Sequence, residues 1–413
     1  MLKLATIDTF IIILMFALLP IDMINGIVLM KGMVLPISIG QFYKIIIIIF
    51  LLIRFFFTIR LLISTIILIF LLSISSMYQI IFNLEGSDIL LDLIKATKYI
   101  TPFICFLFFV NAFKYSRDKI YPLTLSLVRI SYLILVLNIF TKYIGLGYPA
   151  YKNGGMGSKG FFFAGNEISA LLIILCSIIA FQLWNKKQKI KYSIFLIINL
   201  LAALTISSKT AILGIILVFL IIPFQDKSLK LKKFIPLLGC SIVLLPLTLL
   251  FSWQFIKNTS IIIRIEYFYR ELDFWTFLLS SRNVFLENSY YIFKNNYNLI
   301  EKVIGVGPSK FEYLNDFKVV EMDIMDIFFT YGFLGLIIFI SLIAFILLQA
   351  NAFSKSGRYP YSKLVSMMVI ILLVVSTLAG HVFGSGMSAA FIGLLFALMY
   401  IKEPKNIDKT KLI

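Results

Sequence analysis

The chain has 413 residues, of which 61% are hydrophobic and 14% are charged, and its mean hydropathy is +1.00. This composition excludes a soluble globular protein, in which about 25% of the residues are charged. The formal net charge of +18 has no soluble domain to carry it, so we expect no nucleic acid among the partners and regard membrane lipid as the first partner.

Long runs of Ile, Leu and Phe recur along the chain, and each is long enough to cross a bilayer. A hydrocarbon core about 30 Å thick requires roughly 20 apolar residues of helix. Strands of an outer-membrane barrel alternate polar and apolar residues, so runs that are apolar on every side, such as IIILMFALL, exclude them. We therefore expect an all-α polytopic membrane protein with about twelve transmembrane helices, at residues 7–30, 36–53, 61–82, 97–113, 122–145, 166–184, 190–206, 209–224, 234–252, 324–349, 362–380 and 385–401.

Lysine and arginine gather in alternate connectors between these predicted helices. By the positive-inside rule such connectors lie in the cytoplasm, which places both termini on that side. The basic segments are residues 54–60, 114–119, 186–191, 227–233 and 355–363, and the tail at residues 402–411.

One long polar segment, residues 253–324, interrupts the pattern on the opposite face. Its mixture of aromatic residues and charges of both signs predicts an extracytoplasmic loop of amphipathic helices lying over the membrane. We therefore expect a first transmembrane part of about nine helices at residues 1–252, then this large loop, and then residues 325–413, with about three helices and a basic cytoplasmic tail.

Few ionisable residues lie within the predicted helices. Asp22 and Lys44 lie near the outer ends of the first two, and we expect them to pair. The cysteines, Cys105, Cys176 and Cys240, lie inside predicted helices at spacings that fit neither a disulfide framework nor a zinc site. Because the sequence contains no cluster of metal ligands, we expect no metal.

The outer connector at residues 146–165 is rich in glycine and contains Lys159. It is either a substrate-contacting loop or a flexible turn. Asn166 directly precedes an apolar run, so this residue either contacts the substrate or caps the helix that follows.

Lys209 follows two serines at the start of an apolar run, which places it in the first turn of a helix. The helix dipole disfavours a cation there by about 0.3–1 kcal/mol. Lys209 therefore either binds an anionic partner, which helix N-termini also attract, or extends to the outer headgroups.

Three arginines of the large loop, Arg264, Arg270 and Arg282, lie among acidic and aromatic residues. Arginine is the preferred bidentate ligand of phosphate. The alternative is internal ion pairing, which contributes about 0–1 kcal/mol for each exposed pair. We favour Arg282 as the phosphate ligand.

Three carboxylates, Glu321, Asp323 and Asp326, lie where the helix predicted at residues 324–349 begins. The helix dipole alone favours acidic residues at this place. Alternatively, a carboxylate partly desolvated by apolar neighbours has a raised pKa and serves as a base near neutrality. The single histidine, His381, is a less favoured candidate base, because a lone histidine is more often a packed residue.

Several motifs together resemble the O-antigen polymerase and ligase superfamily of bacterial membrane glycosyltransferases. They are SSKTAILG, where the family has a Ser-Arg pair, then SSRN in the outer loop, then IGVG, and finally VEMDIMDIFFTYGFLGL. The similarity covers roughly residues 150–340 well and the rest as a pattern of spans.

The resemblance implies a GT-C-like fold and a transferase that acts outside the membrane without a nucleotide sugar, a metal or another cofactor. An acceptor hydroxyl attacks the anomeric carbon of a glycan linked to undecaprenyl pyrophosphate. Arg282 matches the loop arginine of the family and Lys209 its Ser-Arg arginine, so both are expected to hold the pyrophosphate. Glu321 stands where the ligases carry a histidine, and is the expected base.

The glutamate at position 321 favours the polymerase branch, because a ligase is expected to keep the histidine. Lys209 departs from the arginine of the family, and lysine makes no bidentate contact. We expect catalysis from Glu321 and Arg282, and substrate binding from Lys209, Arg264, Arg270, Asn166, Lys159, Asp323 and Asp326.

The expected protein lies in the bacterial cytoplasmic membrane, with its site facing the periplasm or the cell exterior. It polymerises undecaprenyl-pyrophosphate-linked glycans, and the resemblance adds a chain-length co-polymerase as a partner. A ligase-type transferase and a flippase for the same lipid-linked units are the alternatives. The flippase is the weaker one, because transporters require repeated halves and charges near the bilayer midplane.

Overall fold

The computed structural model describes residues 2–33, 35, 37–82, 86, 88–150, 157–224, 266, 269–316 and 318–402. Within this part of the chain every regular element is a helix, and the one β-type contact is an isolated bridge between Tyr148 and Gly160. The predicted all-helical class is therefore confirmed for the described residues.

The helices follow one another along the chain with short connections. The first half contains α1 (Leu2–Phe16), α2 (Leu18–Met30), α3 (Ile39–Phe55), α4 (Ile59–Ile81), α5 (Ile89–Phe140), the 3₁₀ helix η1 (Thr141–Ile144), α6 (Gly165–Asn185), α7 (Lys189–Ile206) and α8 (Lys209–Phe224). The second half contains α11 (Phe274–Leu279), α12 (Arg282–Asn296), α13 (Leu299–Ile304), α14 (Pro308–Leu314), α15 (Asp323–Ser356), α16 (Ser362–Ala379), α17 (Ala389–Ala397) and η3 (Leu398–Tyr400).

Six helical segments of the described residues are long and apolar enough to cross a membrane, which supports a multi-pass membrane protein. They are Leu4–Met30, Ile59–Ile81, Ile89–Ile144, Glu167–Asn185, Lys189–Ile206 and Asp323–Ser356. Shorter apolar helices lie at Lys209–Phe224, Ser362–Thr377 and Ala389–Tyr400. The count of about twelve spans stays a prediction, and the span expected at residues 234–252 lies outside the described residues.

The two spans expected at residues 97–113 and 122–145 belong to one long helix, α5, which begins at Ile89. The basic segment between them was expected to be a connector, yet only Ser116, with φ −141° and ψ 32°, leaves the helical conformation. A helix of 52 residues is about 78 Å long at 1.5 Å per residue, more than twice the thickness of a bilayer core. The break at Ser116 therefore separates two spans within one element.

Small residues let the apolar helices approach one another closely. A methyl group on Gly393 of α17 would lie 2.4 Å from the Pro102 carbonyl oxygen of α5, and one on Gly214 of α8 would lie 2.2 Å from Ile173 of α6. Such close approach is the usual basis of helix packing in membranes. The expected ion pair is confirmed, because Lys44 Nζ lies 2.7 Å from Asp22 Oδ1.

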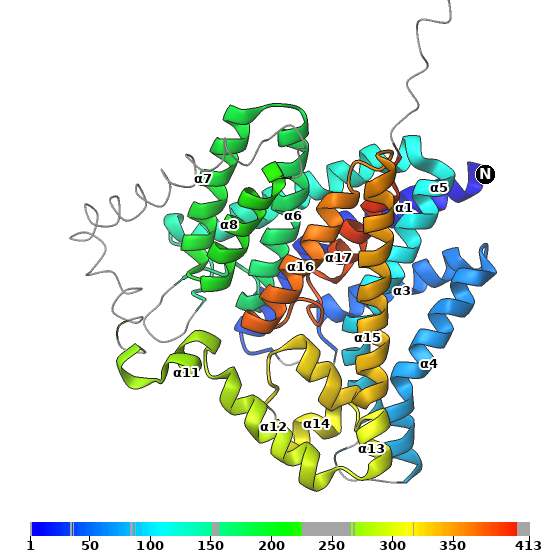
Figure 1. The fold of residues 1–413 in the computed structure, drawn as a ribbon, viewed down its shortest axis with the longest axis vertical. Helices are drawn as coiled ribbons and strands as arrows, with labels where there is room; N and C mark the ends of the chain where they lie inside the picture. The colour runs from blue at the N-terminus through cyan, green and yellow to red at the C-terminus, as the bar shows by residue number, and fades with distance from the viewer. Residues whose placement is uncertain are drawn as a thin grey trace, which may run out of the picture.

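Helices α11 to α14 gather at the end of the molecule opposite the N-terminus (Figure 1). We call these helices the cap. They enclose a small apolar core that is separate from the core of the transmembrane helices and includes Phe293, Tyr297, Phe311 and Phe329. The large loop is therefore a folded unit in its described part, while the segment before residue 266 lies outside it.

Polar contacts attach the cap to the outer ends of α4 and α5. Lys310 Nζ donates to Glu301 Oε1 and to Gln79 Oε1, both at 2.9 Å. The backbone N–H of Ser309 donates to Asp92 Oδ1 at 2.6 Å. Because Glu301 and Asp92 are both buried, these contacts fix the cap on the transmembrane helices.

Helix α15 changes direction at Gly332, where φ is 64° and ψ is −164°. A methyl group there would lie 2.5 Å from the backbone nitrogen of Gly305, and Gly307 donates its N–H to the Thr330 carbonyl oxygen. The IGVG motif therefore packs backbone to backbone against the break in α15. This packing holds the first two turns of α15, and the segment before them, against the cap.

Candidate functional site

Arg282 connects the cap to the segment that precedes α15. Its Nε donates to the Glu321 carbonyl oxygen at 3.0 Å, and its Nη2 donates to Glu321 Oε2 at 2.9 Å. Its Nη1 donates to the Leu279 carbonyl oxygen at 3.3 Å. The side chain is only 8% exposed, so its charge acts in a partly dehydrated environment. The two residues expected to be catalytic therefore touch each other.

His381 lies on the other side of Glu321, with 3.9 Å between His381 Nε2 and Glu321 Oε1. Their side chains are 32% and 38% exposed, so both remain accessible. Glu321 and His381 both have positive φ angles, 62° and 52°, which costs non-glycine residues free energy and is frequent at functional sites. The sequence ranked His381 low, and its contact with Glu321 depends on chain segments that are distant in the sequence.

The two neighbours set the protonation of Glu321. Its interaction with His381, together with the Arg282 guanidinium, holds the pKa of Glu321 below its usual range despite partial burial. Burial lowers the pKa of His381, but the carboxylates of Glu321, Asp323 and Asp326 outweigh it, so that pKa is raised. The expectation of a raised pKa is therefore wrong for Glu321, which is ionised at neutral pH between two cationic groups.

Asp323 and Asp326 bind backbone groups of the segments that carry Glu321 and His381. Asp323 Oδ2 accepts from the backbone N–H groups of Val382 and Phe383, each at 2.8 Å, and from Ser376 Oγ at 2.9 Å. Asp326 Oδ1 accepts from the N–H of Val320 at 2.9 Å. Both carboxylates are buried and therefore act on the shape of the site. Their expected contact with substrate stays a prediction.

Lys209 is the first residue of α8, as predicted, and Ser208 Oγ accepts from the N–H of Ala211 at 3.3 Å. Lys209 Nζ donates to the Phe277 carbonyl oxygen at 3.1 Å and lies 3.9 Å from the centre of the Phe277 ring. Phe277 and Leu279 both belong to α11, so Lys209 and Arg282 approach the same short helix. Carbonyl groups at the end of a helix attract cations, and α11 brings the two expected pyrophosphate ligands into one region.

The other expected binding residues lie apart from this pair or outside the described residues. Arg270 forms an ion pair with Glu266 in which the side chains are 73% and 56% exposed. Lys159 donates to the Phe163 carbonyl oxygen at 2.8 Å. Arg264 and the side chain of Asn166 lie outside the described part. The alternative of Asn166 as a helix cap is wrong, because α6 begins at Gly165 with Ala164 in the cap position.

A polar cavity of about 610 Å³ lies beside this site, and His381 and Ser208 form part of its lining. Lys98 and Glu167 also line it, although the sequence analysis singled out neither. An ionisable residue inside a membrane-spanning segment is itself a signal of function, and it would have identified both. Among the described residues, no group of three or more His, Cys, Asp and Glu side chains is arranged to hold a metal.

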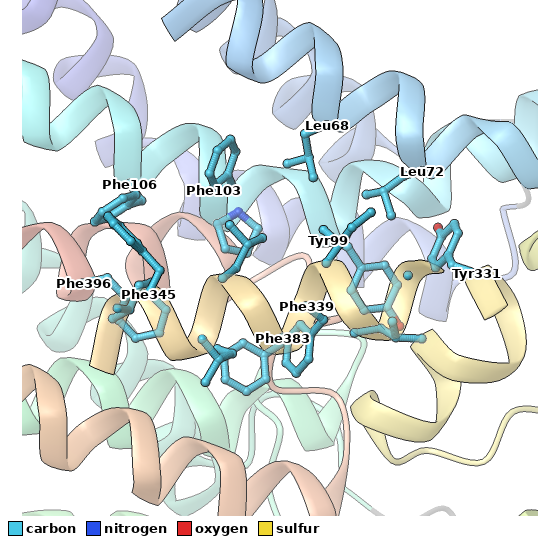
Figure 2. Close-up of a pocket in the computed structure, with 17 residues that line it drawn as sticks. Leu68, Leu72, Tyr99, Phe103, Phe106, Tyr331, Phe339, Phe345, Phe383 and Phe396 are labelled. Carbon is cyan, nitrogen blue, oxygen red and sulfur yellow. The ribbon is translucent and has the colours of Figure 1, made fainter. Parts of the chain in front are cut away.

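An apolar groove of about 90 Å³ lies between α4, α5 and α15. Figure 2 shows Leu68 and Leu72 of α4, Phe103 and Phe106 of α5, and Phe339 and Phe345 of α15 around it. The groove has no ionisable group other than the phenols of Tyr99 and Tyr331, so the acid–base chemistry of the molecule lies in the polar site and not here.

Residues 269–404, about a third of the chain, match the family model described as O-antigen ligase like membrane protein. The comparisons with curated proteins and with solved structures give no match. The matched segment contains Arg282, Glu321 and His381, and Lys209 lies before it. This similarity supports the O-antigen ligase and polymerase superfamily for the part of the chain that holds the site, without distinguishing a polymerase from a ligase.

Proposed function

We propose that the protein is a polysaccharide repeat-unit polymerase. It transfers a glycan from undecaprenyl pyrophosphate to the non-reducing end of another lipid-linked repeat unit, on the outer face of the bacterial cytoplasmic membrane. The observation that carries the proposal is the contact between Arg282, Glu321 and His381, within the segment that is similar to the O-antigen ligase family. A buried cation, an ionised carboxylate and a histidine meet at the accessible edge of a polar cavity.

The reaction requires a base and a site for a leaving anion. The acceptor oxygen forms a bond to the anomeric carbon, and the bond between that carbon and the pyrophosphate oxygen breaks. The leaving undecaprenyl pyrophosphate keeps the electron pair, and the proton of the acceptor hydroxyl passes to Glu321. A positioned base of this kind contributes about 10²–10⁴-fold to the rate.

Arg282 and Lys209 take the role of stabilising the leaving group. Both approach α11, at the Leu279 and Phe277 carbonyl oxygens, so both are held in place before substrate binds. Preorganised cations stabilise charge that develops in the transition state more than they stabilise the substrate. Lys209 provides a point charge, whereas Arg282 offers the planar donors that suit a phosphate.

A ligase-type transferase is the second candidate, because the family match includes it equally. It would use the same residues and hand one finished glycan to lipid A core or to a protein. The glutamate at position 321 favours the polymerase. A flippase would need no base beside the cations, and it remains the weaker alternative.

The test uses purified protein in detergent with a pool of undecaprenyl-pyrophosphate-linked repeat units, with and without lipid A core as a second acceptor. A ladder of glycan lengths on a gel supports the polymerase, and we expect a broad one because a separate co-polymerase sets the length. A single transfer to lipid A core supports the ligase. Movement of the lipid across liposomes without a new glycosidic bond contradicts both.

Glu321→Gln tests the base within the same assay. The substitution keeps the size of the side chain and its neutral amide cannot accept the proton, so the rate is expected to fall by about 10²–10⁴-fold. An unchanged rate would return Glu321 to a purely structural role.

A further inference from the structure

The polar cavity lies within a bundle of apolar helices, yet its lining is dominated by groups that form hydrogen bonds. Side chains of α2, α3, α5 and α6 meet there with the connection between α16 and α17. Its volume, about 610 Å³, lies in the range of small-ligand sites, roughly 300–1,000 Å³. The chemistry of the lining therefore indicates what it binds.

Most ionisable groups of the lining have partners in the protein. Lys44 Nζ binds both oxygens of Asp22, at 2.7 and 2.9 Å. Glu167 Oε2 accepts from Ser385 Oγ at 2.8 Å and from the N–H of Met387 at 3.0 Å. These contacts hold the walls of the cavity in place.

Two lining groups lack such partners. Lys98 on α5 is partly buried and makes no hydrogen bond or ion pair with any residue that the structure describes, although its charge acts on Glu167. Asn25 Oδ1 on α2 is buried and has no hydrogen-bond partner in the same part of the chain. Buried polar atoms are almost always hydrogen-bonded, so an ammonium donor and an amide acceptor here require a ligand that both accepts and donates.

Sugar hydroxyls meet this requirement, because each is both a donor and an acceptor. The lining also offers the hydroxyls of Thr97 and Thr101 and the ring of Phe163, which is 50% exposed. An apolar lipid chain would leave Lys98 and Asn25 without partners, and burying such groups unpaired is unfavourable. The ligand class that fits is a glycan.

The lining includes His381, but neither Arg282 nor Lys209 is part of it. A glycan in the cavity therefore approaches Glu321 from the side of His381, away from the expected pyrophosphate ligands. This is the side from which the acceptor, and not the donor, must present its hydroxyl to the base.

We propose that this cavity binds the terminal sugar of the acceptor glycan, with Lys98 and Asn25 as specificity-determining contacts. The assignment rests on the proposed transferase function, to which it adds the acceptor subsite. Lys98 donates to hydroxyl or carboxylate oxygens of the sugar, and Asn25 Oδ1 accepts a hydroxyl proton. The ion pair of Asp22 with Lys44 forms the wall behind Asn25.

The test compares two probes on the detergent-solubilised full chain by isothermal titration calorimetry. One is the repeat-unit oligosaccharide released from its carrier by mild acid, and the other is inorganic pyrophosphate. Lys98→Met is expected to weaken oligosaccharide binding by about tenfold or more, because charged hydrogen bonds are lost, and to leave pyrophosphate binding unchanged. Lys98→Arg is expected to restore part of the oligosaccharide affinity.

Lys31→Met is the matched control, because Lys31 is exposed at the end of α2 and does not line the cavity. If Lys98→Met loses both ligands, Asn25→Leu provides the second readout, with the same loss of oligosaccharide expected. Oligosaccharide affinity equal to wild type in either folded variant overturns the proposal. A ladder that is independent of Lys98 keeps the polymerase and removes the acceptor subsite, whereas oligosaccharide binding that depends on Lys98 without any ladder does the reverse.

Discussion

Glu321 owes its charge to residues from two distant segments of the chain. Arg282 reaches it from the cap, and His381 reaches it from the connection between α16 and α17. With the pKa of Glu321 lowered and that of His381 raised, both groups are charged at mildly acidic and neutral pH. A base with a low pKa accepts a proton only as the acceptor hydroxyl becomes acidic, which happens when its oxygen bonds to the anomeric carbon.

His381→Gln tests this electrostatic coupling. Without the imidazolium, the pKa of Glu321 rises toward its ordinary value, so the acidic limb of the kcat/KM profile is expected to move to higher pH. In wild type the contribution of the ion pair is complete below about pH 6.5, the ordinary pKa of histidine, and is lost as the pH rises through the raised pKa of His381. The variant should lack this alkaline limb, and an unchanged pH profile would remove His381 from the site.

The conformation of Glu321 depends on Gly380. A methyl group on Gly380 would lie 1.7 Å from the Glu321 carbonyl oxygen, and its φ of 62° and ψ of −179° lie in a region reserved for glycine. Gly380→Ala is expected to abolish activity and to lower the melting temperature. Gly357→Ala is the control, because Gly357 also has a positive φ of 67° but nothing lies within 4 Å. Equal losses in the two variants would assign the effect to backbone strain alone.

At the scale of elements, the cap depends on a buried carboxylate at its junction with α4. The side chain of Glu301 is 4% exposed, and Lys310 is its ion-pair partner at 2.9 Å. Removing one partner of a buried ion pair costs about 3–5 kcal/mol. Lys310→Met is therefore expected to speed hydrogen exchange in residues 299–314 and to reduce activity.

The control for this junction is Lys318→Met, because Lys318 is an exposed residue near the same cap. Both variants should insert into the membrane, since neither changes an apolar helix. Exchange in residues 299–314 that is as slow in Lys310→Met as in Lys318→Met would show that Lys310 does not hold the cap.

Local patterns predicted the helices well, because length and hydropathy act within one segment. The helix start at Lys209 and the pair of Asp22 with Lys44 followed from such patterns. The cap position of α6 was wrong, since a favourable cap residue does not decide where the first hydrogen-bonded turn forms. The break at Ser116 carries no glycine or proline at the position itself, so composition gave no sign of it.

The site was predictable only in part, because its contacts join residues far apart in the sequence. The pairing of Arg282 with Glu321 agrees with the residues named from the family resemblance. The contact of His381 with Glu321 depends on Asp323, which holds the backbone of residues 382–384. No periodicity in the sequence reports such a contact, and the same is true of the cavity that joins Lys98 to Asn25.

At the scale of the whole molecule, the proposed site lies at the junction of the cap with the transmembrane helices (Figure 1). Arg282 belongs to the cap, Lys209 begins a shorter apolar helix, and Glu321 directly precedes a long transmembrane helix. A lipid-linked substrate needs such a place, because its carrier stays in the bilayer while its glycan is in water. The account therefore makes the junction the place of transfer.

The most direct test of this claim measures the release of undecaprenyl pyrophosphate from lipid-linked repeat units by wild type, Arg282→Ala and Arg358→Ala. Arg358 is exposed at the connection between α15 and α16 and serves as the control for loss of an arginine. The account predicts wild-type release from Arg358→Ala and a loss of about 10²–10³-fold in Arg282→Ala, as for removal of one preorganised donor. Wild-type release and a full glycan ladder from an equally well inserted Arg282→Ala variant would contradict it.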